Sequence, residues 1–152
     1  MDMRNNDINN FNNEITIVMD SKSQNESLSR MMVSAFLAPL DPHMTLLTDI
    51  KTAVSEAVTN AVIHGYKNMD GKITLGMTLN NGKLDIVVAD TGVGISDINA
   101  AMEPLFTTTS PDMERAGMGF TVMESFMDSV KVTSVLGSGT TIEMTKDLLC
   151  DD

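Results

Sequence analysis

The chain has 152 residues, a hydrophobic fraction of 42% and a formal net charge of −11 at pH 7. This length suits one domain whose core needs neither disulfides nor metals, and the lone Cys150 permits no intramolecular disulfide. The negative charge argues against direct binding to nucleic acid or to anionic membranes. A basic protein partner is compatible with it, although acidity can also serve solubility alone.

The first residues are polar. Residues 1–13 contain six Asn and are expected to form a disordered leader, without the apolar stretch of a signal peptide. No apolar run in the chain reaches the length of a membrane-spanning helix. We therefore expect a cytoplasmic protein with a single domain over residues 14–149.

A strand and two helices are predicted next. Residues 14–20 have the β-branched content of a strand. The first helix should end near Ala38, because Pro39 disfavours helix in the residue before it. The strongest predicted helix covers residues 45–64, with Gly65 as its stop. The expected apolar stripes are Leu28, Met31, Met32, Ala35 and Phe36 in the first helix, and Leu47, Ile50, Val54, Ala57, Val58 and Ala61 in the second.

A β-hairpin follows. Residues 72–79 and 83–89 flank Asn80-Asn81-Gly82, and an Asn-Gly pair tolerates the positive φ of a tight hairpin turn. A short helix over residues 96–103 and a mobile loop over residues 104–116 are expected after it.

A helix over residues 118–127 and a second hairpin complete the chain. Residues 130–135 and 140–145 flank Gly137-Ser138-Gly139. The order of elements favours an α/β (α+β) two-layer sandwich, with one mixed, mostly antiparallel sheet and helices on one face. Most of the fourteen methionines are expected to fill its core.

The long helix has a polar ridge. Thr52, Glu56, Asn60 and His64 recur every four residues, so an α-helix places them in one row. Together they offer a base, a metal ligand and a hydrogen-bond donor. Taken alone, an ordinary solvated face explains the row better.

A second candidate site begins at Asp90, at the end of a buried-looking strand. The glycines that follow, Gly92 and Gly94, allow a backbone to approach a ligand closely, and the carboxylate can accept a hydrogen bond from an exocyclic amine. A turn with a capping Asp is the simpler alternative. The segment is not a Walker loop, because no Gly-Lys-Ser/Thr follows.

Two further segments are weaker candidates. Gly117 to Phe120 is expected at the start of a helix, where free N–H groups and the helix dipole bind anions. A flexible lid hinge is an alternative that is compatible with this role. In the last hairpin, the Thr140 hydroxyl could reach a ligand, although a tight turn is the default interpretation.

In order and spacing, these segments resemble the ATP-binding family that includes gyrase, Hsp90, histidine kinases and MutL. Residues 56–65 resemble its N box, residues 90–94 its first glycine box and residues 117–119 its second. The similarity is strongest to the anti-sigma-F serine kinase branch and covers nearly all of the chain after Asn13. It rests on S-E-A-V-T-N-A-V-I-H-G-Y (residues 55–66), P-L-F-T-T (residues 104–108) and E-R-A-G-M-G-F (residues 114–120).

The resemblance implies a Bergerat-type ATP-binding fold and a role for each motif residue. Glu56 would be the catalytic base, Asn60 the Mg²⁺ ligand, and Asp90, assisted by Thr140, the partner of the adenine amino group. The remaining expected nucleotide contacts are His64, Gly92, Gly94, Thr107, Thr108, Gly117, Met118, Gly119 and Phe120. Arg30 and Arg115, isolated cations in an acidic chain, are expected to bind protein partners.

The function implied is that of an ATP- and Mg²⁺-dependent protein serine/threonine kinase. It would bind and inhibit a sporulation sigma factor, phosphorylate an anti-anti-sigma factor on Ser, and form a homodimer. A detached histidine-kinase-type ATPase domain is an alternative that would need a helical hairpin with a phosphoacceptor His. A gyrase- or Hsp90-like ATPase would need a further domain after Asp152. An ATP-dependent binding module without kinase activity is a third alternative, against which Glu56 argues.

Overall fold

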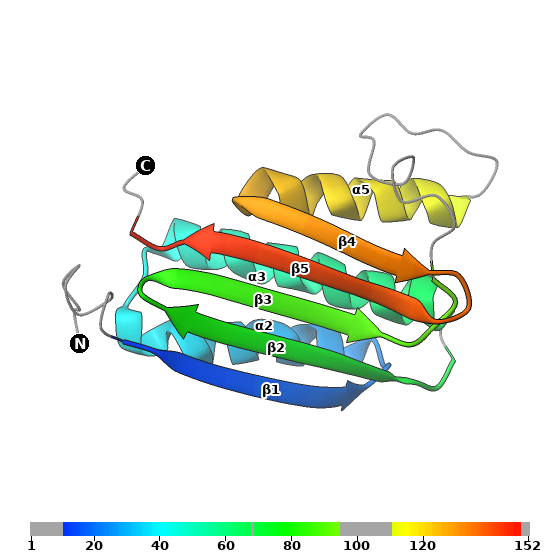
Figure 1. The fold of residues 1–152 in the computed structure, drawn as a ribbon, viewed down its shortest axis with the longest axis horizontal. Helices are drawn as coiled ribbons and strands as arrows, with labels where there is room; N and C mark the ends of the chain where they lie inside the picture. The colour runs from blue at the N-terminus through cyan, green and yellow to red at the C-terminus, as the bar shows by residue number, and fades with distance from the viewer. Residues whose placement is uncertain (1–10, 68, 95–110, 150–152) are drawn as a thin grey trace.

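In the part of the chain that the structure describes, five strands form one sheet and three α-helices cover one of its faces (Figure 1). The structure, a computed structural model, describes residues 11–67, 69–94 and 111–149, except for the side chains of residues 111–117. The strand order is β1-β2-β3-β5-β4, and all four neighbouring pairs are antiparallel. The expected two-layer α/β fold is confirmed. The strands are β1 Asn13–Asp20, β2 Lys72–Asn80, β3 Lys83–Asp90, β4 Ser129–Val135 and β5 Gly139–Asp147.

Both predicted hairpins are present. Asn81 and Gly82 have φ values of 52° and 78°, so both central residues of the β2–β3 turn adopt the left-handed conformation for which Asn-Gly is suited. The β4–β5 turn also uses this region, at Gly137 and Gly139, with φ values of 84° and 109°. The expected helix over residues 96–103 lies outside the described residues.

Helix α2 (Gln24–Leu37) ends where predicted, and a short 3₁₀ turn (Ala38–Leu40) contains Pro39. The predicted apolar stripe of this helix is confirmed only for Phe36, which is buried, and Met32, which packs against the core. Leu28 and Met31 are 37% and 67% exposed, and Ala35 is also exposed. The helix packs through a face offset from the expected one, because the contact with helix α3 and the sheet, and not the apolar residues of α2 alone, selects the buried face. The buried residues of α2 are Ser29, Val33, Phe36 and Leu37.

Helix α3 (Met44–Asn60) has the predicted stripe and continues into a π-helical segment, η2 (Ala61–Gly65). A π-helix bonds residue i to i+5, so the four-residue repeat of an α-helix does not continue through it. Gly65 ends the helical path, but it is not among the glycines with positive φ. Gly65 therefore does not end the helix by adopting a left-handed conformation. The reason for a glycine at this position is its contact with Asp90.

Helix α5 (Pro111–Phe126) begins earlier than expected. Residues 111–116 belong to it and not to a loop, because proline at a first helical position loses no hydrogen bond. Gly117 to Phe120 therefore lies well inside the helix. Its amides are not the free N–H groups of a helix start, so the anion site predicted there on this ground is corrected.

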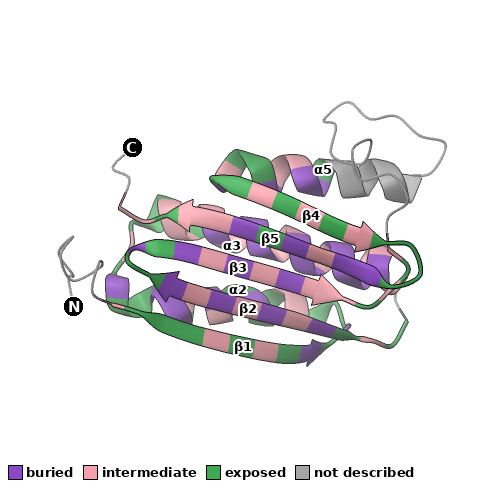
Figure 2. Cartoon of the chain, in the orientation of Figure 1, coloured by how far each residue is buried: buried purple, intermediate pink, exposed green. Residues whose placement is uncertain are grey.

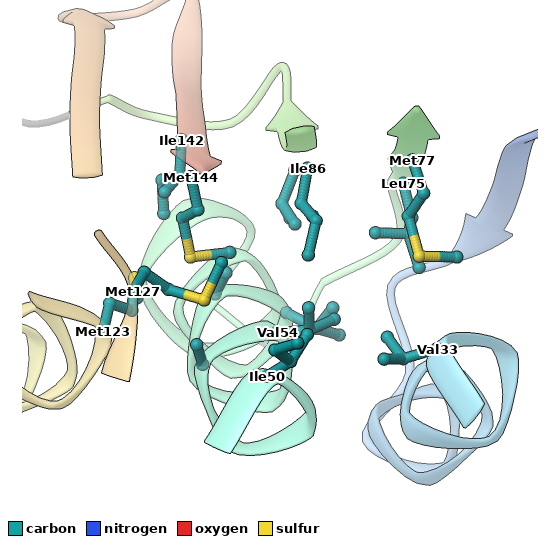
Figure 3. Packing of buried hydrophobic residues seen from close by; sticks show 14 of the residues in the cluster. Val33, Ile50, Val54, Leu75, Met77, Ile86, Met123, Met127, Ile142 and Met144 are labelled. Carbon is teal, nitrogen blue, oxygen red and sulfur yellow. The ribbon is translucent and has the colours of Figure 1, made fainter. Parts of the chain in front are cut away.

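The core lies between the sheet and the helices. Buried and half-buried residues alternate along β2 and β3 (Figure 2), as expected when one face of a sheet is covered. In Figure 3, Met123 from α5 and Met127, which directly follows that helix, lie near Met144 from β5, and Ile50 from α3 points toward the same layer. Methionine fills part of the core as predicted, but only part: Met31, Met44, Met69 and Met118 are exposed.

Candidate functional site

Helix α3 places Glu56 and Asn60 one turn apart, where helix α5 meets them at Gly119. A Cβ at Gly119 would lie 3.2 Å from Glu56 Oε2 and 3.2 Å from both Asn60 side-chain polar atoms. A larger residue would press on both groups, so the glycine allows helix α5 to approach the polar ridge closely. Two of the predicted site segments, distant in sequence, are thus in direct proximity.

Asn60 is a buried polar residue with an unused donor. It is 9% exposed, and Nδ2 has no hydrogen-bond partner in the described part of the chain. Buried amides are normally paired, and leaving one unpaired costs about 1–3 kcal/mol. Such an uncompensated group is typical of a position that serves a ligand.

The pKa of Glu56 is raised. The first cause is burial, which penalises the charged form, and the second is repulsion from Glu26. Glu26 on α2 accepts hydrogen bonds from the Ser55 hydroxyl, and its Oε1 lies 3.2 Å from Arg30 Nε. Arg30 is therefore not the isolated cation expected from the sequence, because Glu26 pairs with it one helical turn away.

Asp90 occupies the other end of the site, at the last position of β3. A Cβ at Gly65 would lie 2.9 Å from Asp90 Cγ and Oδ1 and 3.0 Å from Oδ2. Gly65 is thus required where η2 passes the carboxylate. This contact joins the end of the α3–η2 helix, which carries Glu56 and Asn60, to the Asp90 turn.

Burial raises the pKa of Asp90, and hydrogen bonds from the backbone N–H groups of Gly92 and Thr140 oppose that rise. The Gly92 N–H donates to Asp90 Oδ1 at 2.9 Å. Thr140 is buried and is the cross-strand partner of Asp90, but its hydroxyl lies 2.8 Å from the Ser134 hydroxyl. The predicted neighbourhood of Asp90 and Thr140 is present in the structure.

The two glycines after Asp90, Gly92 and Gly94, allow close packing of backbone within the protein. A Cβ at Gly92 would overlap the carbonyl oxygen of Gly65, and one at Gly94 would overlap that of Val135. The Val93 N–H donates to Gly65 O at 2.9 Å, which holds the turn against the end of η2. Close packing of backbone on backbone therefore accounts for both glycines, whereas the sequence suggested room for a ligand.

The remaining predicted site residues lie in η2, in helix α5 or outside the described residues. His64 is half-buried in η2, so it does not continue the α-helical ridge of Thr52, Glu56 and Asn60. Met118 is 63% exposed and Phe120 is 1% exposed, so the Phe120 side chain belongs to the core. Thr107 and Thr108 lie outside the described residues, as does the side chain of Arg115, and of Gly117 only its place in helix α5 is described.

Sequence reasoning missed three residues at this site. Gly65 was interpreted as a helix stop, and Tyr66, which contacts the Asp90 turn through its hydroxyl, was given no role. Glu26 could have been found, because an acidic residue four positions before Arg30 is a recognised helix pair. The contacts of Gly65 and Tyr66 join segments about 25 residues apart, which no local pattern reveals.

Among the described residues, none of the helices is long and apolar enough to cross a membrane. That part of the chain also contains no group of three or more His, Cys, Asp and Glu side chains arranged to hold a metal ion. Asn60, the metal ligand expected from the sequence, remains a prediction.

Comparison with curated proteins shows extensive sequence similarity to anti-sigma F factors. The chain is 52% identical to the anti-sigma F factor of Bacillus velezensis over 90% of this chain and 93% of that protein. It is 51% identical to the protein of that name from Bacillus subtilis, with the same coverage. The corresponding protein of Clostridium kluyveri is 50% identical over 90% of this chain and 95% of its own length.

Solved structures share the fold at lower identity. The RsbU and RsbW domains of Rv1364c from Mycobacterium tuberculosis superpose with a TM-score of 0.64 and 22% identity, over 90% of this chain and 32% of that one. The family model of the histidine kinase-like ATPase domain matches residues 21–146. The chain therefore belongs to the anti-sigma F factors, within the family of histidine kinase-like ATPase domains.

Proposed function

We propose that this protein is an anti-sigma factor and an ATP-dependent serine kinase. It binds and inhibits a sigma factor of RNA polymerase and transfers the γ-phosphoryl group of ATP to a serine of an anti-anti-sigma factor. The observation that carries the kinase proposal is the convergence of Glu56, Asn60 and Gly119. The names of its relatives support the anti-sigma role.

Glu56 is the proposed general base. It would accept the proton of the attacking serine hydroxyl, or orient that hydroxyl, and a partly buried carboxylate with a raised pKa is suited to this task. Glu56 has no such task in a module that only binds ATP. Phosphoryl transfer otherwise needs mainly positioning and charge neutralisation.

Asn60 is the residue proposed to hold Mg²⁺. Its side-chain oxygen, Oδ1, would coordinate the ion, whereas its buried Nδ2, which has no hydrogen-bond partner within the described part of the chain, could donate to a phosphate oxygen. Bound together with ATP, the ion would neutralise phosphate charge. An uncharged amide binds Mg²⁺ weakly, so the ion would arrive with the nucleotide. Gly119 would bring helix α5 near the same phosphates, and Gly117, Met118 and Phe120 remain candidates for contacts with them.

Asp90 is the proposed adenine contact. Its half-buried carboxylate can accept a hydrogen bond from the 6-amino group of adenine, which guanine lacks at that position. Thr140 lies across the strand pair from it and would assist. His64, Gly92, Gly94, Thr107 and Thr108 remain further candidates for contacts with the nucleotide.

The exposed face of α2 is the proposed docking surface for protein partners. The side chain of Arg30 is 44% exposed, and Leu28 and Met31, about one turn apart, are exposed apolar residues of the same helix. Arginine is enriched among interface hot spots. Arg115 is proposed to add to this surface. We also propose a cytoplasmic homodimer.

The test is a phosphotransfer assay. The purified protein is incubated with γ-labelled ATP and Mg²⁺, a sigma factor, and an anti-anti-sigma factor from the same cells. We expect a stable complex with the sigma factor and acid-stable label on one serine of the anti-anti-sigma factor, located by mass spectrometry.

Other outcomes favour the alternatives. Acid-labile label on a histidine would indicate a histidine-kinase-type domain. A nucleotide-dependent complex without any transfer would indicate a binding module. Failure to bind a sigma factor at all would contradict the anti-sigma role.

A further inference from the structure

Tyr66 lies at the junction of three segments. It directly follows η2, and its N–H donates to Ala61 O at 2.9 Å. Its half-buried ring lies against Gly71, where an added Cβ would overlap the ring. The position of the ring is therefore determined from both sides, by the end of the helix and by the backbone before β2.

The Tyr66 hydroxyl is fully engaged. It donates to Lys72 O at 2.5 Å and accepts from the Thr91 N–H at 2.8 Å, and Thr91 Oγ1 lies 3.2 Å away. A phenol has one donor and can accept from other groups, so these contacts use its capacity. The hydroxyl thus links the start of β2 to the residue directly after Asp90.

The turn that begins at Asp90 is held at three successive residues. The Thr91 N–H bonds to Tyr66, the Gly92 N–H bonds to the Asp90 carboxylate, and the Val93 N–H bonds to Gly65 O. Two of these anchors, Gly65 and Tyr66, are consecutive residues at the end of the helix that carries Glu56 and Asn60. Removing the Tyr66 hydroxyl would release the first peptide of the turn while the other anchors remained.

We propose that the Tyr66 hydroxyl is a positioning group for adenine recognition: by holding the Thr91 amide, it sets the direction in which Asp90 presents its carboxylate. The inference rests on the proposed role of Asp90 as the adenine contact. A carboxylate recognises an amino group strongly only when the hydrogen-bond geometry is good. A preorganised acceptor also avoids the cost of ordering the turn upon binding.

A purely structural role for Tyr66 makes a different prediction. General support of the fold would affect every nucleotide equally, whether or not it carries a 6-amino group. A positioning role affects only the contact made through Asp90. Purine riboside triphosphate, which has hydrogen in place of the 6-amino group of ATP, separates the two.

The experiment measures dissociation constants of ATP and of purine riboside triphosphate, each with Mg²⁺, by calorimetry. Tyr66→Phe keeps the ring on Gly71 and removes only the hydroxyl. We expect ATP to bind about three- to tenfold more weakly, as for the loss of one hydrogen bond, with the analogue nearly unaffected. The preference for ATP over the analogue should therefore fall, while phosphotransfer at saturating ATP is retained.

Thr91→Val is the matched control, because it removes the other hydroxyl of this cluster and keeps the Thr91 N–H. It should preserve the preference for ATP. In an Asp90→Ala background, Tyr66→Phe should cause no further loss of preference. Equal weakening of both ligands by Tyr66→Phe, or an unchanged preference, would overturn the positioning role.

The Asp90→Ala variant alone separates this inference from its premise. If it leaves the preference for ATP intact, the proposed adenine contact fails, and the inference fails with it. If Asp90→Ala abolishes the preference and Tyr66→Phe does not change it, only the role of Tyr66 is refuted.

Discussion

Gly65 has no side chain because the carboxylate of Asp90 occupies the space that one would need: an added Cβ would lie 2.9 Å from Asp90 Oδ1. Gly65→Ala should therefore displace the carboxylate or the end of η2. Overpacking of this kind costs about 1–3 kcal/mol, and we expect ATP affinity to fall about tenfold or more, measured by calorimetry.

The matched control for this substitution is Gly76→Ala. No atom lies within 4 Å of a Cβ at Gly76, in the middle of β2. ATP affinity equal to that of the unchanged protein is expected for it. If both variants bind ATP normally, the contact between Gly65 and Asp90 does not position a nucleotide group.

Glu56→Gln should separate binding from chemistry. The substitution keeps the size of the side chain and removes its basicity, so ATP binding should persist while phosphotransfer falls about 10²- to 10⁴-fold. Single-turnover transfer to the anti-anti-sigma factor at saturating ATP measures the effect. Glu124→Gln, at an exposed position of α5, is the control. A normal transfer rate in Glu56→Gln would exclude Glu56 as the base.

The pH dependence of transfer should respond to Glu26. Burial and repulsion from Glu26 both raise the pKa of Glu56, and the base acts only when deprotonated, so kcat should decline as the pH falls toward that pKa. Glu26→Gln removes the repulsion, lowers the pKa of Glu56, and should move this acidic decline to lower pH. Glu14→Gln, at an exposed position of β1, should not move it. A shift to higher pH would contradict the electrostatic coupling.

Asp90 should reduce stability at neutral pH. Burial raises the pKa of Asp90 in the folded protein above that of an ordinary aspartate, so its contribution to stability is present below the unfolded pKa and is lost as pH rises through the folded one. Asp90→Asn should therefore melt a few degrees higher than the unchanged protein near pH 7, and the gain should vanish as the pH approaches about 4. Thermal unfolding across this pH range tests the sign. Asp85→Asn, on the same strand, controls for the loss of one negative charge.

Arg30→Ala should weaken binding of the sigma factor and leave ATP affinity unchanged. An exposed helical pair such as Glu26–Arg30 contributes only about 0.2–0.5 kcal/mol to stability, so the variant should fold. Truncation of an interface hot spot costs about 2 kcal/mol or more, roughly thirtyfold in affinity. Lys83→Ala, another exposed cation, should bind like the unchanged protein. Loss of ATP binding in Arg30→Ala would show that the residue is structural.

Local patterns were enough to predict most of the fold. The β2–β3 hairpin follows from Asn81 and Gly82, whose backbone conformation few other residues adopt readily. The stripe of α3 follows from its 3.6-residue period. The stripe of α2 could not be assigned in this way, because Leu28 and Met31 are as apolar as the residues that the helix buries. Which face packs depends on the neighbouring helix.

The sequence by itself determined the chemistry available in this protein: a carboxylate and an amide one helical turn apart, an acid at a strand end, and the glycines that follow it. Only the tertiary structure decided what those groups meet. Gly119 lies against Glu56 and Asn60, and Gly65 against Asp90, while the Tyr66 hydroxyl holds the Thr91 amide. Each of these contacts joins segments far apart in the chain, and each depends on how closely two backbones approach. Spacing along a sequence carries no such information, because close approach is set by packing of the whole core.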